Sequence, residues 1–535
     1  MDHLTIAPIV IPLAAGATMV LVGEQRRSLK AGLGLASTLL LFALAIALLW
    51  MADSADAAVV HVYRLGNWPS VFGIVLVLDR LTALMLTLTA VLGLCAFVFS
   101  LARWQRAGAH FHPLFQFQLM GLNGAFLAGD LFNLFVFFEV MLAASYGLAL
   151  HGSATARVRA GLHYIAINLT ASLLFLVGVS MIYGVAGTLN MANLAARIPA
   201  VAGGDRALLE AGAAILGVAF LVKAAIWPVG FWLPATYAAA SAPAAAILSV
   251  LSKVGIYAVM RLWLLLFGEA AGASAGFGGD WLLFGGLLTI GFGSVAVLAT
   301  QDVARLAGAS VLVSSGTLLA AVGMGQVAVT GGALFYLASS VLAIAAFFLL
   351  IELVERGRDV GADVLAVTRE AYGEGEEDTG EEAVGIAIRA TTAILGTSFM
   401  GCALVLAGLP PLSGFLAKFA MLEPLFARGG NGPSAATWAF LGILVLSGLA
   451  TIIAMTRAGI DAFWASPAET PPLLRVSEIV PVVFLLGLCV ALTVQAGPAL
   501  RYMQATALSL HQPRDYVRSV LSGSPPTLRS GEAAP

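Results

Sequence analysis

Residues 221–243, LVKAAIWPVGFWLPATYAAASAP, form the stretch that decides the fold. The stretch is apolar enough to lie in a membrane, yet Pro228 and Pro234 interrupt it and Lys223 places a charge inside it. A proline removes a backbone donor and clashes with the preceding helical turn. In lipid, such a break is tolerated only where the freed backbone groups face protein or a water-filled cavity. The stretch therefore predicts a broken membrane helix beside a polar interior.

A second interrupted stretch lies at residues 402–422, CALVLAGLPPLSGFLAKFAML. Its break is formed by Pro410, Pro411 and Gly414, and the letters PLSGF there resemble PVGF in the first break. Paired broken helices in matching halves of a chain indicate an inverted-repeat transporter site near the membrane midplane.

The composition agrees with a membrane protein. Of the 535 residues, 60% are apolar and only 10% are charged, against about 25% charged in an average soluble domain. These values exclude a soluble globular protein, a disordered chain and a disulfide-built secreted domain. The balance of 27 basic against 29 acidic residues gives no basic footprint for nucleic acid. The chain is therefore predicted to be an all-α polytopic membrane protein.

A membrane helix needs about 20 apolar residues, and on that criterion we predict about 14 transmembrane helices. They lie near 4–22, 29–51, 79–101, 113–129, 131–150, 161–186, 208–239, 241–267, 281–300, 303–323, 328–353, 388–427, 436–458 and 478–497. Two inverted five-helix repeats, each with a broken helix, would place the two breaks at equivalent positions. The predicted divisions are the first three helices in 1–110, the repeats in 111–267 and 281–458, and the last helix with a polar tail in 478–535.

Arginines in alternate loops give the orientation, because cytoplasmic loops are enriched in basic residues. They predict that both ends of the chain lie on the side of the membrane opposite the cytoplasm. The 354–387 segment is strongly acidic, and we interpret it as a solvated loop since such charge blocks repel. We expect Asp79 and Arg80 to pair locally, and Arg261 to anchor the membrane interface.

The lysines are unusually placed. The chain has 23 arginines but only four lysines; Lys30 is expected in a loop, while Lys223, Lys253 and Lys418 lie inside apolar spans. Arginine cannot lose its proton in a protein, whereas a buried lysine can. A group that must load and release a proton in a dry interior should therefore be lysine.

Glu139 supplies the opposite charge near the centre of the fifth span. A lone carboxylate there is costly unless it is paired or protonated, and Lys223 is the natural partner. An alternative for this pair and for the other lysines is that they only hold helices together. Four secondary candidates are weaker. His163 could titrate and bridge to the cytoplasm or be an interfacial histidine, and Asp130 could cap a helix or serve as an exit carboxylate. Glu423 could pair with Lys418, and Ser314, with its neighbour Ser315, is interpreted as a small packing residue.

No cofactor or metal site is predicted. There is no Walker motif, and the sequence has no haem or iron–sulfur ligand set. Cys95, Cys402 and Cys489 lie far apart inside apolar runs, so we interpret them as buried structural thiols.

Taken together, the motifs resemble the antiporter-like subunits shared by Mrp-type cation/proton antiporters and the proton-pumping arm of respiratory complex I. The matching segments lie within residues 75–460: Asp130 to Glu139, GTLNMAN at 187–193, Lys223 to Pro234, SKVGIY at 252–257 and GLPPLSGFLAK at 408–418. The chain is most similar to the D subunits of Mrp/Pha-type multisubunit antiporters, because WLPATY at 232–237 replaces the histidine-containing stretch typical of the complex I subunits.

The resemblance implies a proton relay and partners. Glu139 and Lys223 would form a modulating ion pair, Lys253 would pass the proton along the central axis, and Lys418 would load or release it. Where many relatives have His or Gln, this chain has Ser314, so water would have to bridge Lys253 and Lys418. The implied partners are the other subunits of a hetero-oligomeric antiporter, protons, Na⁺ or K⁺, and the bilayer.

Two other interpretations remain open. The chain could be a pumping subunit of an NADH-quinone oxidoreductase-like assembly, such as complex I or a membrane hydrogenase, with distant electron transfer driving the same lysines. It could also be a non-conducting scaffold that retains them.

Overall fold

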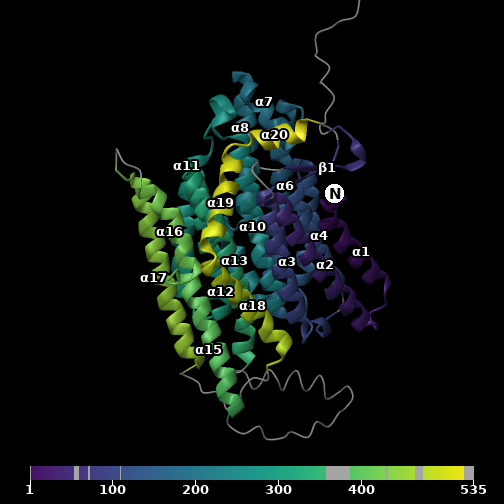
Figure 1. Cartoon of the computed structure of the whole chain (residues 1–535), viewed down its shortest axis with the longest axis vertical. Coiled ribbons are helices and arrows are strands. Elements are labelled where there is room, and N and C mark those ends of the chain that lie inside the picture. The colour runs from purple at the N-terminus through teal and green to yellow at the C-terminus, as the bar shows by residue number, and fades with distance from the viewer. Residues whose placement is uncertain are drawn as a thin grey trace, which may run out of the picture.

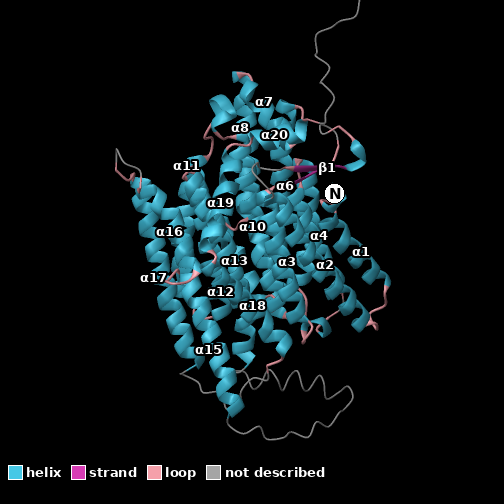
Figure 2. Ribbon diagram, viewed as in Figure 1, coloured by secondary structure: helices cyan, strands magenta, loops and turns pink. Residues whose placement is uncertain are grey.

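A computed structural model describes residues 2–53, 60–69, 73–108, 110–152, 154–356, 386–427, 432–463 and 474–522. Most of these residues form helices that run along the long axis of the molecule (Figures 1 and 2). Within the described residues, 10 helices are long and apolar enough to cross a membrane. The prediction of an all-α polytopic membrane protein is thus confirmed. Most of the predicted acidic loop, residues 357–385, lies outside the described residues.

The first half of the chain contains the elements that lead to the first break. They are α1 (Ala7–Leu21), α2 (Arg27–Asp53), α3 (Arg80–Ser100), α4 (Phe111–Leu127), α5 (Leu131–Ala149), α6 (Thr155–Ala186), α7 (Met191–Arg197), α8 (Gly203–Lys223), α9 (Trp232–Ala239) and α10 (Ala242–Leu266). The short 3₁₀ turns are η1 (Asp2–Leu4), η2 (Leu65–Asn67), η3 (Trp104–Arg106), η4 (Ile198–Ala200), η5 (Val229–Phe231) and η6 (Glu269–Ser274).

The second half repeats the pattern of long helices around a break. Its elements are α11 (Gly279–Ala299), α12 (Val303–Gly323), α13 (Val327–Arg356), α15 (Ile386–Ala407), α16 (Ser413–Phe426), α17 (Ala435–Phe463), α18 (Val476–Val494), α19 (Ala496–His511) and α20 (Arg514–Leu521). Each span predicted from the sequence therefore contains a helix or a pair of helix segments. The division of the sequence into two inverted repeats stays a prediction.

The central helices are buried on all sides. The most apolar windows of α10 and α13 are entirely buried, and α12 is nearly so, whereas α6, α11 and α18 expose much of their surface. Helices that are apolar all round belong in the interior of a large protein or in lipid. Charged and hydroxyl side chains on α10, α12 and α13 therefore lie far from solvent. The functional site must be sought among these buried polar side chains.

Two elements were not predicted. A hairpin of β1 (His61–Arg64) and β2 (Val75–Leu78) pairs antiparallel between α2 and α3, with His61 opposite Leu78. The run that forms β2 is rich in valine and leucine but is too short to cross a membrane, and β-branched residues favour strands.

No helix was predicted within the polar tail, whereas α19 and α20 lie there, after α18. Buried Met503, Ala507 and Leu510 recur at helical spacing along α19. The Gln504 amide also donates to the Ala328 carbonyl on α13 (3.1 Å).

Two predictions about charged residues need correction: the pairing of Asp79 with Arg80, and the placement of Lys30 in a loop. Asp79 does not pair with its neighbour Arg80; it caps α3 and forms a buried, bidentate pair with Arg261 from α10, while Arg80 lies 3.4 Å from Asp53. Lys30 is not in a loop. It lies in the first turn of α2, is only 2% exposed, and donates to Glu24 Oε1 at 2.6 Å.

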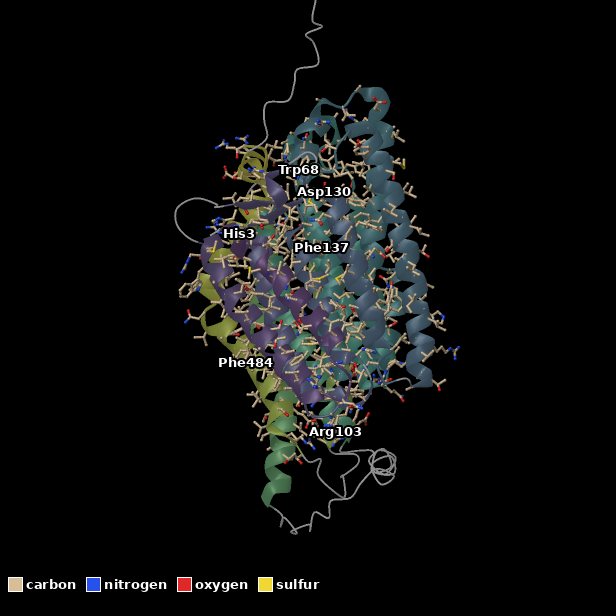
Figure 3. The ribbon with its side chains drawn as sticks, turned by 90° about the vertical axis from the view of Figure 1, so that its right-hand side faces the viewer. His3, Trp68, Arg103, Asp130, Phe137 and Phe484 are labelled. Carbon is tan, nitrogen blue, oxygen red and sulfur yellow. The ribbon has the colours of Figure 1, made fainter. Side chains whose placement is uncertain are left out.

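The helix order puts the arginine-rich loops at one end of the molecule. Figure 3 shows Arg103 at the end opposite Trp68 and Asp130. The N-terminus and α20 both lie toward the end that carries α7 (Figure 1). This arrangement agrees with the predicted alternation of arginine-rich and arginine-poor loops along the chain. The assignment of the arginine-rich end to the cytoplasm stays a prediction.

Candidate functional site

The first break separates α8 from α9. Lys223 is the last residue of α8, and the chain re-enters a helix at Trp232. A Cβ on Gly230 would lie 2.1 Å from the Ala225 carbonyl oxygen, so only glycine fits there. The Trp227 N–H, freed by the break, donates to Thr289 Oγ1 on α11 at 3.0 Å. The predicted break is present at Pro228, whereas Pro234 lies in the first turn of α9 and causes no interruption of its own.

Lys223 and Glu139 are joined by a hydroxyl group. The Lys223 side chain is 4% exposed, and its Nζ donates to Ser172 Oγ at 3.4 Å. Ser172 in turn donates to Glu139 Oε1. Lys223 Nζ also lies 5.2 Å from the centre of the Phe138 ring, a cation–π contact. The expected direct ion pair is therefore replaced by a Glu139–Ser172–Lys223 bridge that spans α5, α6 and α8.

The position of Lys223 has a second electrostatic consequence. The last carbonyls of an α-helix have no intrahelical partner and carry a partial negative charge. A cation at the end of α8 is therefore favoured by the helix itself. The broken helix thus holds a charged lysine at membrane depth without a directly bound carboxylate.

Lys253 occupies the centre of the molecule on α10. Its side chain is fully buried, and Nζ donates to Ser315 Oγ at 3.0 Å and lies 3.5 Å from the Val311 carbonyl oxygen, both on α12. Within the described residues, no carboxylate lies within ion-pair distance of this lysine. Lys253 is therefore held by neutral acceptors alone.

The second break repeats the geometry of the first. α15 ends at Ala407 and α16 begins at Ser413, with Pro410 and Pro411 between them as predicted. A Cβ on Gly414 would lie 2.0 Å from the carbonyl oxygen of Val405, as close as in the first break. This glycine therefore lets the second helical segment lie against the end of the first.

Lys418 Nζ donates to the Ala407 carbonyl at 2.8 Å, again at the C-terminal end of the first helical segment. Both breaks thus have a lysine beside them, but only Lys418 contacts a carbonyl at the end of the first helical segment, whereas Lys223 contacts Ser172. The structure does not bring Glu423 to this lysine: Glu423 is exposed, and no ion pair joins the two among the described residues.

Two of the remaining candidates, Asp130 and His163, have partners other than the three lysines Lys223, Lys253 and Lys418. Asp130 caps α5 by accepting from the Phe132 and Asn133 amides at 2.8 and 3.0 Å. His163 is exposed on α6, and its Nδ1 lies 3.0 Å from the Arg159 carbonyl oxygen. These two side chains have local structural roles in this arrangement.

Sequence reasoning missed that two serine hydroxyls contact the lysines. Ser172 and Ser315 are the direct partners of Lys223 and Lys253, whereas Ser314 hydrogen-bonds to Ser340 at 3.0 Å. Small hydroxyl residues pack between membrane helices throughout such proteins. A serine in an apolar run therefore gave no signal that it contacts a lysine.

Buried ionisable side chains at two broken helices define the class: a polytopic membrane protein with the architecture of a secondary transporter. The chain belongs to the family described as NADH:quinone oxidoreductase/Mrp antiporter, TM, whose family model matches residues 128–447.

Among curated relatives, the chain is 61% identical to the D subunit of a probable K⁺/H⁺ antiporter of Rhizobium meliloti, with 98% of each chain covered. It is 33% identical to the D subunit of the Na⁺/H⁺ antiporter of Alkalihalophilus pseudofirmus, over 97% of this chain and 100% of that protein. These relatives place the chain with the D subunits, as the sequence motifs predicted.

Solved structures give the same fold. A chain of the Mrp complex from a Dietzia species matches with a TM-score of 0.81 and 26% identity, over 97% of this chain and 100% of that one. A chain of respiratory complex I from Thermus thermophilus matches with a TM-score of 0.74 and 22% identity, over 97% of this chain and 99% of that one. At that identity, the second likeness concerns the fold alone.

Proposed function

We propose that the chain is one subunit of a multisubunit monovalent cation/proton antiporter in a bacterial inner membrane. Protons move through it by way of Glu139, Lys223, Lys253 and Lys418, in exchange for K⁺ or Na⁺ moved by the whole complex. The relatives support this proposal, since both are named as parts of cation/proton antiporters. The relative at 61% identity belongs to a probable K⁺/H⁺ antiporter, so K⁺ is the first cation to test.

One observation carries the proposal: three lysines are held inside the membrane region without a directly bound carboxylate. Placing a lysine at the centre of a membrane helix costs roughly 2.5–3.5 kcal/mol. A polar contact between membrane helices returns on average only about 0.6 kcal/mol. Structural contacts alone therefore do not offset the free-energy cost of burying three lysines. We infer that the lysines are kept because the function of the protein needs them.

The choice of lysine specifies that function. A guanidinium keeps its proton under all conditions in a protein, whereas an ammonium can release one to a neighbour. The Ala407 carbonyl at the end of α15 stabilises the charged form of Lys418, and the C-terminal end of the α8 dipole favours the charged form of Lys223. Lys223 and Lys418 can thus alternate between a charged state favoured by the helix end and a neutral state after the proton has left.

The Ser172 bridge links the first lysine to Glu139. The hydroxyl accepts from Lys223 while it donates to the carboxylate. A movement of α6 therefore changes both contacts at once, whereas a movement of α5 or α8 changes one of them. A shift that weakens the bridge loosens the charged form of Lys223 and favours transfer of its proton toward Lys253. Coupling to cation movement requires two states of this kind, each biased by both ions.

The test uses inside-out vesicles from an antiporter-deficient strain that expresses the whole operon. The measured quantity is the collapse of a respiration-generated ΔpH after addition of K⁺ or, separately, Na⁺. The proposal predicts a collapse with at least one cation, and its loss when this chain alone is deleted. An unchanged ΔpH with both cations in the complete, assembled complex would contradict it and favour a redox-driven proton pump instead.

A further inference from the structure

The short helix α9, which follows the first break, is held at its far end by an arginine. α9 has only 8 residues, and isolated helices shorter than about 12–15 residues are marginal in water. Its last carbonyl, on Ala239, accepts a hydrogen bond from Arg157 Nε at 2.7 Å. A cation at the C-terminal end of a helix also interacts favourably with the partial negative charge there. Arg157, near the start of α6, therefore caps α9.

Arg157 is itself oriented by two loops at the arginine-rich end. Its Nη1 donates to the His151 carbonyl, and its guanidinium lies 5.4 Å from the centre of the Trp104 ring, a cation–π contact. Trp104 lies in η3, next to Arg103 (Figure 3). Because the donors of a guanidinium form a rigid, planar fork, these contacts together fix its position. The loops therefore determine where the end of α9 lies.

The Trp104 indole continues these contacts into the second half of the chain. Its N–H donates to both carboxylate oxygens of Glu352, at 2.8 and 3.0 Å. Glu352 lies near the end of α13, and it also accepts from Arg356 one turn further on. Arg356 in turn donates to the buried Glu478, in the first turn of α18, at 2.6 Å. A continuous series of polar contacts thus runs from the end of α9 to α13 and α18.

The position of α9 matters because this helix packs against α12, which holds the central lysine. Gly308 of α12 lies so close to α9 that a Cβ there would be 2.7 Å from the Cα of Pro234. About two turns further along α12, Ser315 accepts the hydrogen bond from Lys253. At its other end, α9 follows the break that begins after Lys223. A shift of α9 therefore changes the surroundings of both lysines.

We propose that Arg157, Trp104 and Glu352 couple the first broken helix to α13, so that the two halves of the chain move together. Arg157 is a positioning residue, since it acts on the lysines through α9. Coupling between distant sites needs a connected structural element that both sites bias, and this series of contacts provides one. The role in exchange rests on the proposed function, whereas the link between Trp104 and α9 can be measured without it.

The first arm of the test measures amide hydrogen–deuterium exchange of α9 in the assembled complex. Trp104→Phe keeps an aromatic ring beside Arg157 but removes the N–H that Glu352 accepts. Arg159→Gln is the matched control, because Arg159 is an exposed arginine on the same helix. We expect amide exchange in α9 to rise at least about threefold in Trp104→Phe and to stay unchanged in the control. Unchanged amide exchange in Trp104→Phe would overturn the proposed link.

The second arm measures the maximal rate of cation-dependent ΔpH collapse and the apparent KM for the cation, per assembled complex. A positioning role predicts that Trp104→Phe and Arg157→Gln each lower the maximal rate about fivefold, with the apparent KM within about twofold of wild type. Arg159→Gln should keep the wild-type values. Wild-type rates in the assembled Trp104→Phe and Arg157→Gln variants would overturn the proposal.

The double variant of Trp104→Phe and Arg157→Gln tests whether the two residues act through one series of contacts. If they do, it should be no slower than the slower single variant, whereas multiplied losses would overturn the proposal. If Arg157→Gln fails to assemble, Trp104→Phe decides in both arms. Absence of cation exchange in the wild-type complex would contradict the proposed function, and the amide-exchange arm would still decide whether Trp104 acts on α9.

Discussion

Removal of the Ser172 hydroxyl should uncouple Glu139 from Lys223. In Ser172→Ala, the carboxylate loses a donor and the lysine loses its acceptor at 3.4 Å. A hydrogen bond to a charged group is worth about 1.5–3 kcal/mol. The substitution removes that energy from the charged form of Lys223, so reloading of the lysine with a proton becomes about tenfold less favourable or more, and exchange slows accordingly, since 1.36 kcal/mol corresponds to a factor of ten. Ser172→Thr keeps the hydroxyl and should retain most of the exchange rate.

The assay is the initial rate of cation-dependent ΔpH collapse in vesicles, normalised to the amount of assembled complex. Ser180→Ala is the matched control, because Ser180 is an exposed hydroxyl on the same helix that bonds only to the Leu176 carbonyl at 2.7 Å. Wild-type rates in assembled Ser172→Ala, or an equal loss in Ser180→Ala, would refute the role of the bridge.

Three further predictions concern stability. Gly414→Ala would place a Cβ 2.0 Å from a backbone oxygen, so it should lower the unfolding temperature in detergent, whereas Gly442→Ala, with nothing within 4 Å, should not. Asp79→Asn breaks the buried pair with Arg261 and should cost about 3–5 kcal/mol of unfolding free energy; an unchanged melting temperature would show that the pair is dispensable. The hydrogen bond from Lys30 lowers the pKa of Glu24, so its stabilisation is present above the ordinary glutamate value and is lost as pH falls through the lower folded value. Melting curves between pH 7 and about pH 3 should therefore decline less in Glu24→Gln than in wild type, and identical declines would contradict this assignment.

The broken helices and the three intramembrane lysines could be predicted because each has a strong local signal in the sequence. Pro228 and the Pro410–Pro411 pair interrupt apolar runs that would otherwise be continuous helices, and the structure breaks at both places. Each intramembrane lysine is the only charge in its stretch of sequence. Such a residue can be recognised without knowledge of its neighbours in space.

The contacts of those lysines could not be predicted, because they depend on how helices far apart in sequence are arranged. Ser172 lies 51 residues before Lys223, and Ser315 lies 62 residues after Lys253. The same limit explains the misassigned partner of Asp79, since Arg261 is 182 residues away while Arg80 is adjacent. Neighbours in sequence are a poor guide to charge partners when long helices bring distant residues together.

The role of α19 was missed for a different reason. Its sequence is less apolar than the membrane spans because Arg501, Gln504 and His511 interrupt it. The polar residues find partners in the fold: Gln504 donates to a carbonyl of α13, and His511 lies 3.0 Å from Thr330 Oγ1. Composition alone indicated a tail, whereas tertiary contacts stabilise a helix.

The most direct test of the lysine relay is the charge-conserving variant Lys418→Arg. This side chain is only partly buried and donates to a single carbonyl, so a guanidinium can keep the charge and the contact but not release a proton. The measurement is cation-dependent ΔpH collapse in vesicles that contain equal amounts of assembled wild-type or variant complex. The account predicts that exchange is abolished in Lys418→Arg. Wild-type exchange in this variant would contradict it, because a fixed charge would then serve as well as a titrating one.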